Sequence, residues 1–342
     1  MRHALLATII ICISQHCLAQ SNVPITALPQ AYKSVFVSDL TNILYASQGL
    51  LALKASNLIN SQSNDCTEFA ANGICTQLGA RYTELSSPKI ASRSIVLNSG
   101  YLITNQWHMG AYVDAGHITS QPSFTNVKQK GEDPILGIYS VYKDNIGGAP
   151  YNFRLGANTG STALDVSTSN LGNLGSLSRN INIKAQSYLA LLSAPISVDP
   201  KAMITPYLGT TYTTMNVDGS NNNSSKISNL PIIFNGVSTS IFALQVGLNS
   251  IYKPNDSIIL VATAGIQHTL SSSIGNMTVS SLPALSAYTG QTSLANNVPT
   301  FMATAKYKTY DNQELTAKII YRQEVYQRIG VTSYNLNYSI GF

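Results

Sequence analysis

From Ile74 to the last residue, apolar and polar side chains alternate along the chain with a period of two. The C-terminal segment is the clearest example. Ser, Asn and Gly occupy one face of it, and the other face carries Tyr334, Leu336, Tyr338, Ile340 and Phe342. This alternation predicts a β-strand with one polar and one apolar face, and an aromatic end is typical of a strand that faces lipid.

Twelve segments with this pattern follow one another along the chain. The predicted strands span residues 74–85, 90–104, 107–120, 134–143, 151–165, 182–198, 202–216, 236–253, 258–270, 300–310, 313–327 and 331–342. An even number of strands is expected of a single-chain bacterial outer-membrane barrel. The C-terminal set Tyr334, Leu336, Tyr338, Ile340 and Phe342 is the expected assembly signal of such a barrel.

The connections between the predicted strands differ in length according to their place in the order. Those after even-numbered strands are short, at 105–106, 144–150, 199–201, 254–257 and 311–312. Four of those after odd-numbered strands are long, at 121–133, 166–181, 217–235 and 271–299. Short periplasmic turns opposite long external loops are typical of an outer-membrane barrel, whereas a soluble sandwich has no reason to alternate in this way. The sequence therefore predicts an all-β fold, a 12-stranded antiparallel transmembrane barrel over residues 74–342.

A different periodicity precedes the barrel. Apolar residues recur near helical spacing at Leu40, Ile43, Leu44, Leu51, Ala55 and Leu58, which predicts a helix over 37–61. Its many Ser, Asn and Gln residues make it too polar to span lipid. Residues 20–73 are thus expected to form an N-terminal segment that contains this helix and a loop between two cysteines.

The N-terminus predicts export. Arg2 precedes an apolar stretch from Ala4 to Ile13, and small residues before Gln20 predict a signal peptide, residues 1–19, cleaved after Ala19. Cleavage removes two of the four cysteines. The remaining pair, Cys66 and Cys75, is most simply one local disulfide in an oxidising compartment.

Composition narrows the function classes. Charged residues make up 10% of the chain, well below the ~25% of soluble domains. The net charge is only +5 and the chain contains no run of Lys and Arg residues, which argues against a nucleic-acid-binding protein. His108 and Asp114 share the polar face of one predicted strand, but six residues on a strand span about 20 Å, too far for a catalytic pair. We expect no enzyme, no metal site and no cofactor.

Basic residues gather on the predicted lumen side of the strands. They are Arg81, Arg154, Lys184, Lys306, Lys308, Lys318 and Arg322. A water-filled basic lumen would favour anions, whereas a lumen filled by the helix would pair these cations with carboxylates or helix carbonyls. A turn centred on Asn312 would place Lys306 directly opposite Lys318, with Asp39, the helix C-terminal carbonyls or Glu324 as partners.

A helix followed by a twelve-stranded barrel that ends on Tyr338, Ile340 and Phe342 resembles the β-domain of autotransporters. The resemblance implies that the helix lies inside the barrel and links an exported passenger to the first strand. About seventeen residues separate Ala19 from Val37, and the helix lacks the Asn-Asn pair at which some members cleave themselves. We therefore expect a translocator or surface-display barrel with a very short passenger or none.

Two alternatives stay open at this stage, a porin-like passive channel with the helix outside the lumen and an adhesin that acts through the long loops. The expected location is the bacterial outer membrane. The expected partners are its lipid, lipopolysaccharide and the barrel assembly machinery, for a monomeric protein whose surface ligand the sequence does not identify.

Overall fold

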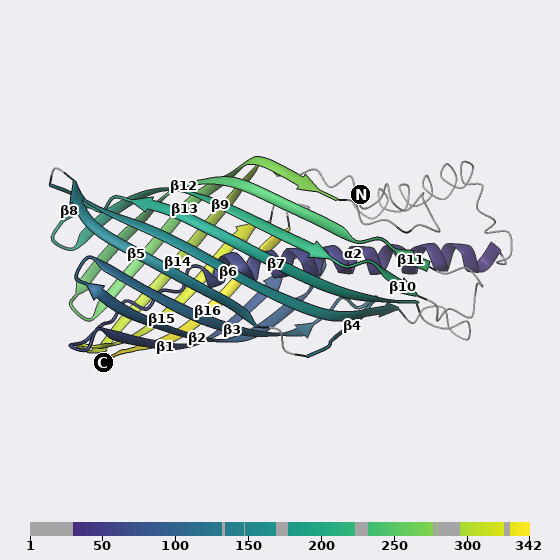
Figure 1. Ribbon diagram of the computed structural model, residues 1–342, viewed down its shortest axis with the longest axis horizontal. Coiled ribbons are helices and arrows are strands. Elements are labelled where there is room, and N and C mark those ends of the chain that lie inside the picture. Colours follow the sequence, from purple (N-terminus) through teal and green to yellow (C-terminus); the bar gives the residue numbers. More distant parts are fainter. Residues whose placement is uncertain are drawn as a thin grey trace.

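The computed structural model describes residues 30–131, 134–146, 148–168, 177–222, 232–275, 279, 295–324 and 329–342. One helix and twelve long strands dominate it (Figure 1). They are α2 (Gln30–Ser61), β1 (Ile74–Leu85), β2 (Ala91–Thr104), β3 (Trp107–Ser120), β5 (Ile135–Ile146), β6 (Ala149–Thr168), β7 (Leu177–Ser193), β9 (Ala202–Val217), β12 (Val237–Asn255), β13 (Ile258–Ile274), β14 (Asn297–Tyr310), β15 (Gln313–Gln323) and β16 (Gly330–Gly341). The short strands are β4 (Asn126–Gln129), β8 (Ile196–Asp199), β10 (Ser220–Asn222) and β11 (Ile232–Phe234).

The long strands form one closed antiparallel barrel. Each pairs with its neighbour in the chain, β9 pairs with β12, and β16 pairs with β1 to complete the circle. At the closing seam, Leu78 lies opposite Tyr338 and Tyr82 opposite Tyr334. Closure leaves no open edge among the twelve long strands, which a sheet in lipid requires. The predicted twelve-stranded transmembrane barrel is confirmed.

The two ends of the barrel differ as predicted. We call the end with the short connections, such as 311–312, the turn end, and the end with the long connections, such as 218–236, the loop end. Several strands reach further toward the loop end than their patterns predicted: β6 continues to Thr168 and β13 to Ile274. The predicted strand over 182–198 is instead β7, which begins at Leu177, and the separate short β8.

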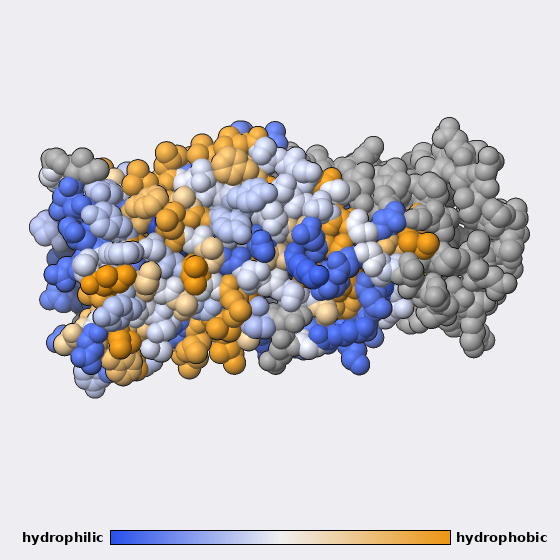
Figure 2. Space-filling view, in the orientation of Figure 1, coloured by the Kyte–Doolittle hydropathy of each residue, from blue (hydrophilic) through white to orange (hydrophobic). Residues whose placement is uncertain are grey.

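An apolar band covers the outer surface of the barrel. Figure 2 shows hydrophobic residues gathered around its middle, with hydrophilic residues toward both ends. Large side chains such as Ile95, Ile138 and Leu208 are at least half exposed on this face. Aromatic residues, Tyr310 among them, lie near the turn end of the band, where a lipid interface favours them. The outer face therefore has the chemistry that lipid requires.

The C-terminal part of helix α2 lies inside the barrel, and its N-terminal part projects beyond the strands at the loop end (Figure 1). It begins at Gln30 rather than at the predicted Val37, and it ends at Ser61 as predicted. From Gly49 to Leu58 every residue is buried. The wall surrounds this part of the helix, which therefore has no solvent-facing stripe and need not be amphipathic. In the described part of the chain, no helix has the length and apolar character needed to cross a membrane.

Candidate functional site

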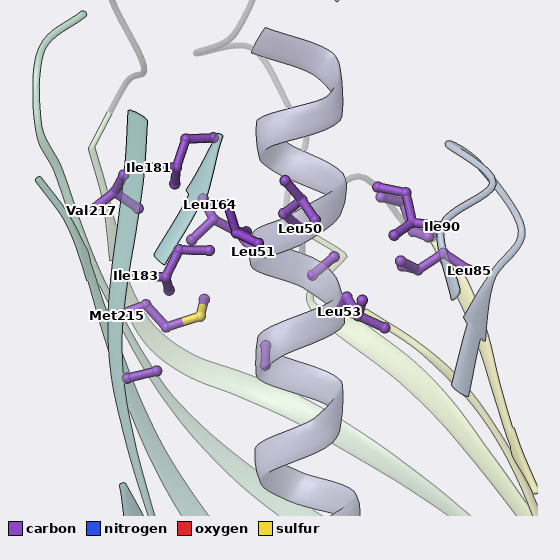
Figure 3. Close-up of a cluster of buried hydrophobic side chains, with 14 of the residues drawn as sticks. Leu50, Leu51, Leu53, Leu85, Ile90, Leu164, Ile181, Ile183, Met215 and Val217 are labelled. Carbon is purple, nitrogen blue, oxygen red and sulfur yellow. The ribbon is translucent and has the colours of Figure 1, made fainter. Parts of the chain in front are cut away.

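The lumen and the segment that fills it form the candidate functional site. We call residues 37–73, the described helix side chains and the extended chain after them, the plug. Near the loop end, an apolar collar surrounds it. Figure 3 shows its side chains around the helix, drawn from α2, four strands and one loop: Leu50, Leu51, Leu53, Leu85, Ile90, Leu164, Ile181, Ile183, Met215 and Val217. Each is at most 4% exposed, and burying such a side chain contributes about 1.5–3 kcal/mol.

Toward the turn end, the contacts between plug and wall become polar. The Arg81 guanidinium on β1 lies 2.6 Å from the Asp114 carboxylate on β3, and both groups are buried. Arg81 also donates a hydrogen bond of 2.9 Å to the Ser61 hydroxyl, which in turn donates to Asp114. Three elements are therefore joined at the C-terminal end of α2.

Two further cations hold the chain just beyond the helix. The Lys318 ammonium on β15 donates to the Ser63 carbonyl at 3.0 Å, and Arg154 on β6 pairs with Asp65 and bonds the Gln62 carbonyl. These two carbonyls belong to the turn that follows the last helix residue, Ser61. Cations from the wall bond this turn, so they anchor the plug.

Three more of the predicted lumen cations pair with carboxylates. Lys306 lies 2.8 Å from Glu314, Lys308 lies 3.3 Å from Glu68 of the plug, and Arg322 lies 3.0 Å from Glu324. Glu314 and Glu324 are buried. Charges out of water require such partners, so these three cations are neutralised by the carboxylates beside them.

Comparison with known proteins identifies the barrel. A model of the autotransporter β-domain matches residues 90–318, more than half of the chain. The chain belongs to the autotransporter β-domain family. This family places the barrel in the bacterial outer membrane, where a helix inside the lumen agrees with the resemblance drawn from the sequence.

Solved structures of two such domains share the fold. The translocator domain of autotransporter NalP from Neisseria meningitidis is 14% identical, with 87% of this chain and 96% of that chain covered and a TM-score of 0.61. The transport unit of autotransporter AIDA-I from Escherichia coli is 11% identical, with coverage of 84% and 97% and a TM-score of 0.53. No curated protein sequence matches the chain significantly.

The hairpin of this β-domain that carries Lys306 and Lys318 has a different register from the predicted one. Lys306 lies opposite Thr316, and Lys318 lies opposite Thr304. A bulge between Lys308 and Tyr310, next to the turn, shifts the register of the whole hairpin. The two lysines are therefore not directly opposite each other, contrary to the prediction.

The predicted partner Asp39 is also wrong for these lysines. It lies 24 residues before Ser63, and a helix of that length spans about 36 Å. Lys318 instead bonds the carbonyl of Ser63, in the turn two residues after the last residue of α2. Lys306 pairs with Glu314 on the neighbouring strand, so neither lysine uses a predicted partner.

Lys184 lies on the outside of the β-domain, contrary to the prediction that it faces the lumen. Its side chain is 64% exposed, and its ammonium is 3.9 Å from Asp218. Near the loop end, β7 turns its apolar residues Ile181 and Ile183 inward to the collar, so the polar positions face outward. The inward cation of this strand is Arg179, which is 1% exposed and lies 5.0 Å from the Phe234 ring centre.

The polar side chains of α2 itself were not among the residues predicted for the site. Lys54 donates to the Ser161 carbonyl at 2.7 Å and Asn60 to the Ser333 hydroxyl at 2.7 Å. Asn158 on β6 donates back to the Leu58 carbonyl at 2.7 Å. The sequence of α2 could have indicated these contacts. Apolar and polar residues are mixed on several sides of the helix, so a wall that surrounds it must supply polar as well as apolar side chains.

The cysteines lie inside the barrel, between the C-terminal end of the helix and the turn end. Cys66 and Cys75 are joined by a disulfide with a Cα–Cα distance of 5.8 Å, and both are fully buried. The Cys66 backbone N–H donates to the Tyr139 hydroxyl at 3.0 Å. The bond ties the extended part of the plug to the start of β1.

The residues considered for catalysis are not brought together. The buried His108 ring packs 5.3 Å from the Phe69 ring of the plug, and Asp114 is occupied by Arg81. Among the described residues, no three His, Cys, Asp or Glu side chains are grouped closely enough to hold a metal ion.

The predicted assembly residues lie on the outer face of β16. Tyr334, Leu336, Tyr338 and Phe342 are 38–54% exposed. Phe342 itself follows the strand, and its backbone N–H donates to the Ile74 carbonyl at 2.8 Å. The last residue of the β-domain therefore takes part in closing the barrel.

Proposed function

We propose that this β-domain carries the chain N-terminal to α2 through the outer membrane and holds it at the cell surface, with residues 37–73 left in the lumen as a plug. The observation that supports this is the direction of the plug. Its wall contacts run from Tyr45, which bonds Ser87 near the loop end, to Glu68, which pairs with Lys308 near the turn end. A segment attached before Gln30 would then leave the barrel at the loop end.

The test is the location of a tag. An epitope inserted after Asn22 should be accessible to antibody and protease on intact cells, while an epitope in the turn at 256–257 should be accessible only after the outer membrane is permeabilised. A folded barrel with the first tag shielded in intact cells would contradict the proposal. Deleting residues 37–62 should also raise the conductance of the reconstituted protein, because these residues fill the lumen.

The porin-like alternative required the helix outside the lumen, and α2 lies inside it. Adhesion through the long loops stays a prediction, since most of 271–299 lies outside the described residues. We infer that the barrel performs no catalysis of its own. The predicted signal peptide, residues 1–19, also lies outside the described residues, and N-terminal sequencing of the outer-membrane form tests cleavage after Ala19.

We further infer that the assembly machinery reads the outer face of β16 and that the barrel functions as a monomer in lipid and lipopolysaccharide. Deleting Phe342 removes an exposed aromatic side chain and a hydrogen bond at the closing seam. The folded, heat-modifiable form in the outer membrane should fall severalfold while export continues. Phe342→Tyr is the matched control and should assemble normally; equal levels of the deletion variant would contradict the inference.

A further inference from the structure

Basic side chains gather on one side of the outer surface of the β-domain. Near the loop end, four exposed side chains on successive strands point outward: Arg93 on β2, His117 on β3, Lys128 on β4 and Lys184 on β7. On the other side of the barrel, from β9 through β12 to β16, the described outward positions near the loop end carry neither Lys nor Arg. We call the outer surface from β2 to β7 near the loop end the basic arc.

Two cations of the basic arc have no carboxylate partner. Lys130, which follows β4, lies 2.8 Å from the Asp165 carboxylate on β6. Arg93 and Lys128, in contrast, form no ion pair and no side-chain hydrogen bond within the part of the chain that the structure describes. An exposed guanidinium or ammonium group without a carboxylate can bind phosphate oxygens through charge-assisted hydrogen bonds. These two side chains therefore fit an anionic partner.

Arg93 and Lys128 belong to one patch of the surface. His117 on β3 lies directly opposite Arg93 on β2. On its other edge, β3 is joined to β4 by the Gln129 side chain, which donates a hydrogen bond of 3.1 Å to the Gly116 carbonyl. The two cations therefore lie on either side of the same part of β3.

This patch lies at the border of the apolar band. Two residues nearer the turn end, β2 carries Ile95, whose side chain is 63% exposed on the lipid face. On β1, Tyr82 lies opposite Arg93, its hydroxyl donates to Glu84 at 3.3 Å, and its ring centre is 6.2 Å from that of Tyr334 on β16. Tyrosine side chains favour the membrane–water interface. Arg93 is therefore at the level of the lipid headgroups.

Between the basic arc and the turn end, the lipid face is hollowed. A shallow groove of about 640 Å³ crosses the outward side chains of β2, β3, β5, β6 and β7. Its lining is mainly apolar, and the small side chains of Ala111 and Ala157 lie between the larger Leu97, Ile138 and Tyr188. A second groove, of about 1030 Å³, shares both alanines and continues toward the turn end.

The distance between the patch and the groove matches the length of an acyl chain. Leu97 lies four residues from Arg93 on β2, and Val113 lies four residues from His117 on β3, which is about 13 Å along each strand. One leaflet contributes half of the ~30 Å hydrocarbon core, or about 15 Å. An acyl chain whose phosphate is bound at Arg93 therefore reaches the groove, where a flexible chain regains the dispersion contacts that a hollow in a rigid wall lacks.

We propose that the basic arc and the groove together bind a phosphorylated, multiply acylated glycolipid of the outer leaflet, such as the lipid A part of lipopolysaccharide. Its phosphates bind Arg93 and Lys128, and an acyl chain fills the groove. The proposal rests on the proposed function in one respect, that the loop end faces the cell surface, where such glycolipids lie.

The test is native mass spectrometry of the full-length protein in detergent, with hexa-acylated, bisphosphorylated lipid A as the probe. The double variant Arg93→Ser, Lys128→Ser should lower the affinity for lipid A about tenfold or more, because each basic side chain attracts the anionic headgroup. The double variant Lys201→Ser, Lys253→Ser is the matched control. It removes the same charge from exposed positions at the turn end and should bind lipid A as the parent does. Heat-modifiable mobility verifies that each variant is folded.

The groove is tested separately from the charges. Ala111→Leu fills the groove and should lower the affinity severalfold, whereas Ala264→Leu adds the same volume on the lipid face of β13, outside the groove, and should not. Lipid A without its phosphates should bind weakly to the parent.

An affinity that neither Arg93→Ser, Lys128→Ser nor Ala111→Leu lowers overturns the proposal. So does an equal loss in the control at the turn end, because binding then follows net charge alone, and so does equally tight binding of lipid A without phosphates. Tighter binding of phosphatidylglycerol than of lipid A overturns the choice of a glycolipid. Binding in detergent does not depend on which end faces the cell surface, so these outcomes are distinguishable from a shielded N-terminal tag, which contradicts the proposed function.

Discussion

The two halves of the lumen hold the same plug by opposite chemistry. At the loop end, the wall turns apolar side chains inward and polar ones outward, as in a soluble protein, and Leu51 of α2 packs against them. Toward the turn end the wall is apolar outside and polar inside, and the plug is held by Arg81, Arg154 and Lys318. The apolar collar derives its strength from excluding water, whereas the polar end depends on each charge meeting its partner.

This inversion has a physical cause. Within the lipid band the outer face must be apolar, so the polar positions of each strand are left for the lumen. Strands such as β6, which reaches Thr168, continue past the exposed apolar band, where water outside no longer requires apolar side chains. The inner face is then free to be apolar, and α2 supplies the complementary surface. Different substitutions should therefore disrupt the two halves.

The largest effect is expected in the collar. Leu51→Asp places a carboxylate among buried aliphatic side chains without a partner, which should destabilise the seated helix by about 4 kcal/mol or more. Hydrogen exchange measured by mass spectrometry should show faster exchange across α2 while the strands stay protected. Ser38→Asp, on an exposed position of the same helix, should leave exchange nearly unchanged. Equal protection in Leu51→Asp would show that the collar does not hold the plug.

The buried ion pair provides the next test. Asp114→Leu leaves the Arg81 guanidinium buried without its carboxylate, which should destabilise the barrel by about 3–5 kcal/mol. The double variant Arg81→Met, Asp114→Leu removes both charges and should recover most of the loss. The temperature at which heat-modifiable mobility is lost measures both. If the double variant is no more stable than Asp114→Leu, the pair is not the reason for the loss.

The sequence predicted the barrel because lipid imposes a simple rule on it. The strand count, the loop asymmetry and the outward residues of β16 follow from alternation and from turn spacing. The same rule assigned Lys184 to the lumen, and it failed there because β7 beyond the lipid band has its apolar face inside. The predicted pairing of Lys306 with Lys318 is wrong for a local reason. A bulge next to the turn shifts the register, and the alternation of residues does not predict it.

The plug was predictable as a helix but not as a set of contacts. Its C-terminal end followed from periodicity, although the helix begins at Gln30, before the predicted start. The partners of Lys54, Asn60 and Ser61 depend on how the strands of a closed barrel face inward. Residues far apart in sequence meet there, such as Asn60 and Ser333. Tyr207 on β9 likewise lies over Gly247 on β12 and Gly265 on β13, and the pattern along a single strand does not reveal such an arrangement of three strands.

The disulfide should have a smaller effect than the ion pair, because it acts on the unfolded chain. Cys66→Ser with Cys75→Ser opens a loop of about ten residues and should destabilise the barrel by about 2–3 kcal/mol. Urea unfolding in detergent, followed by tryptophan fluorescence of Trp107, measures the loss. Reduction of the unmodified protein should reproduce it, and reduction of the double variant should change nothing. A variant as stable as the parent would show that the polar contacts alone hold this part of the plug.

The smallest effect is expected at Lys184, which was predicted to face the lumen but lies on the outside near the loop end. Its ammonium is 3.9 Å from Asp218 and both side chains are more than half exposed, so Lys184→Ala should change stability by less than about 1 kcal/mol. Lys318 is 9% exposed and bonds the Ser63 carbonyl, so Lys318→Met should lower the stability of the barrel several times more than Lys184→Ala. A membrane-impermeant amine reagent applied to intact cells should label Lys184 and leave Lys318 unmodified. Protection of Lys184 would mean that β7 presents its polar face to the lumen and that the inversion near the loop end is absent in the membrane. Labelling of Lys318 would mean that the plug does not cover its ammonium.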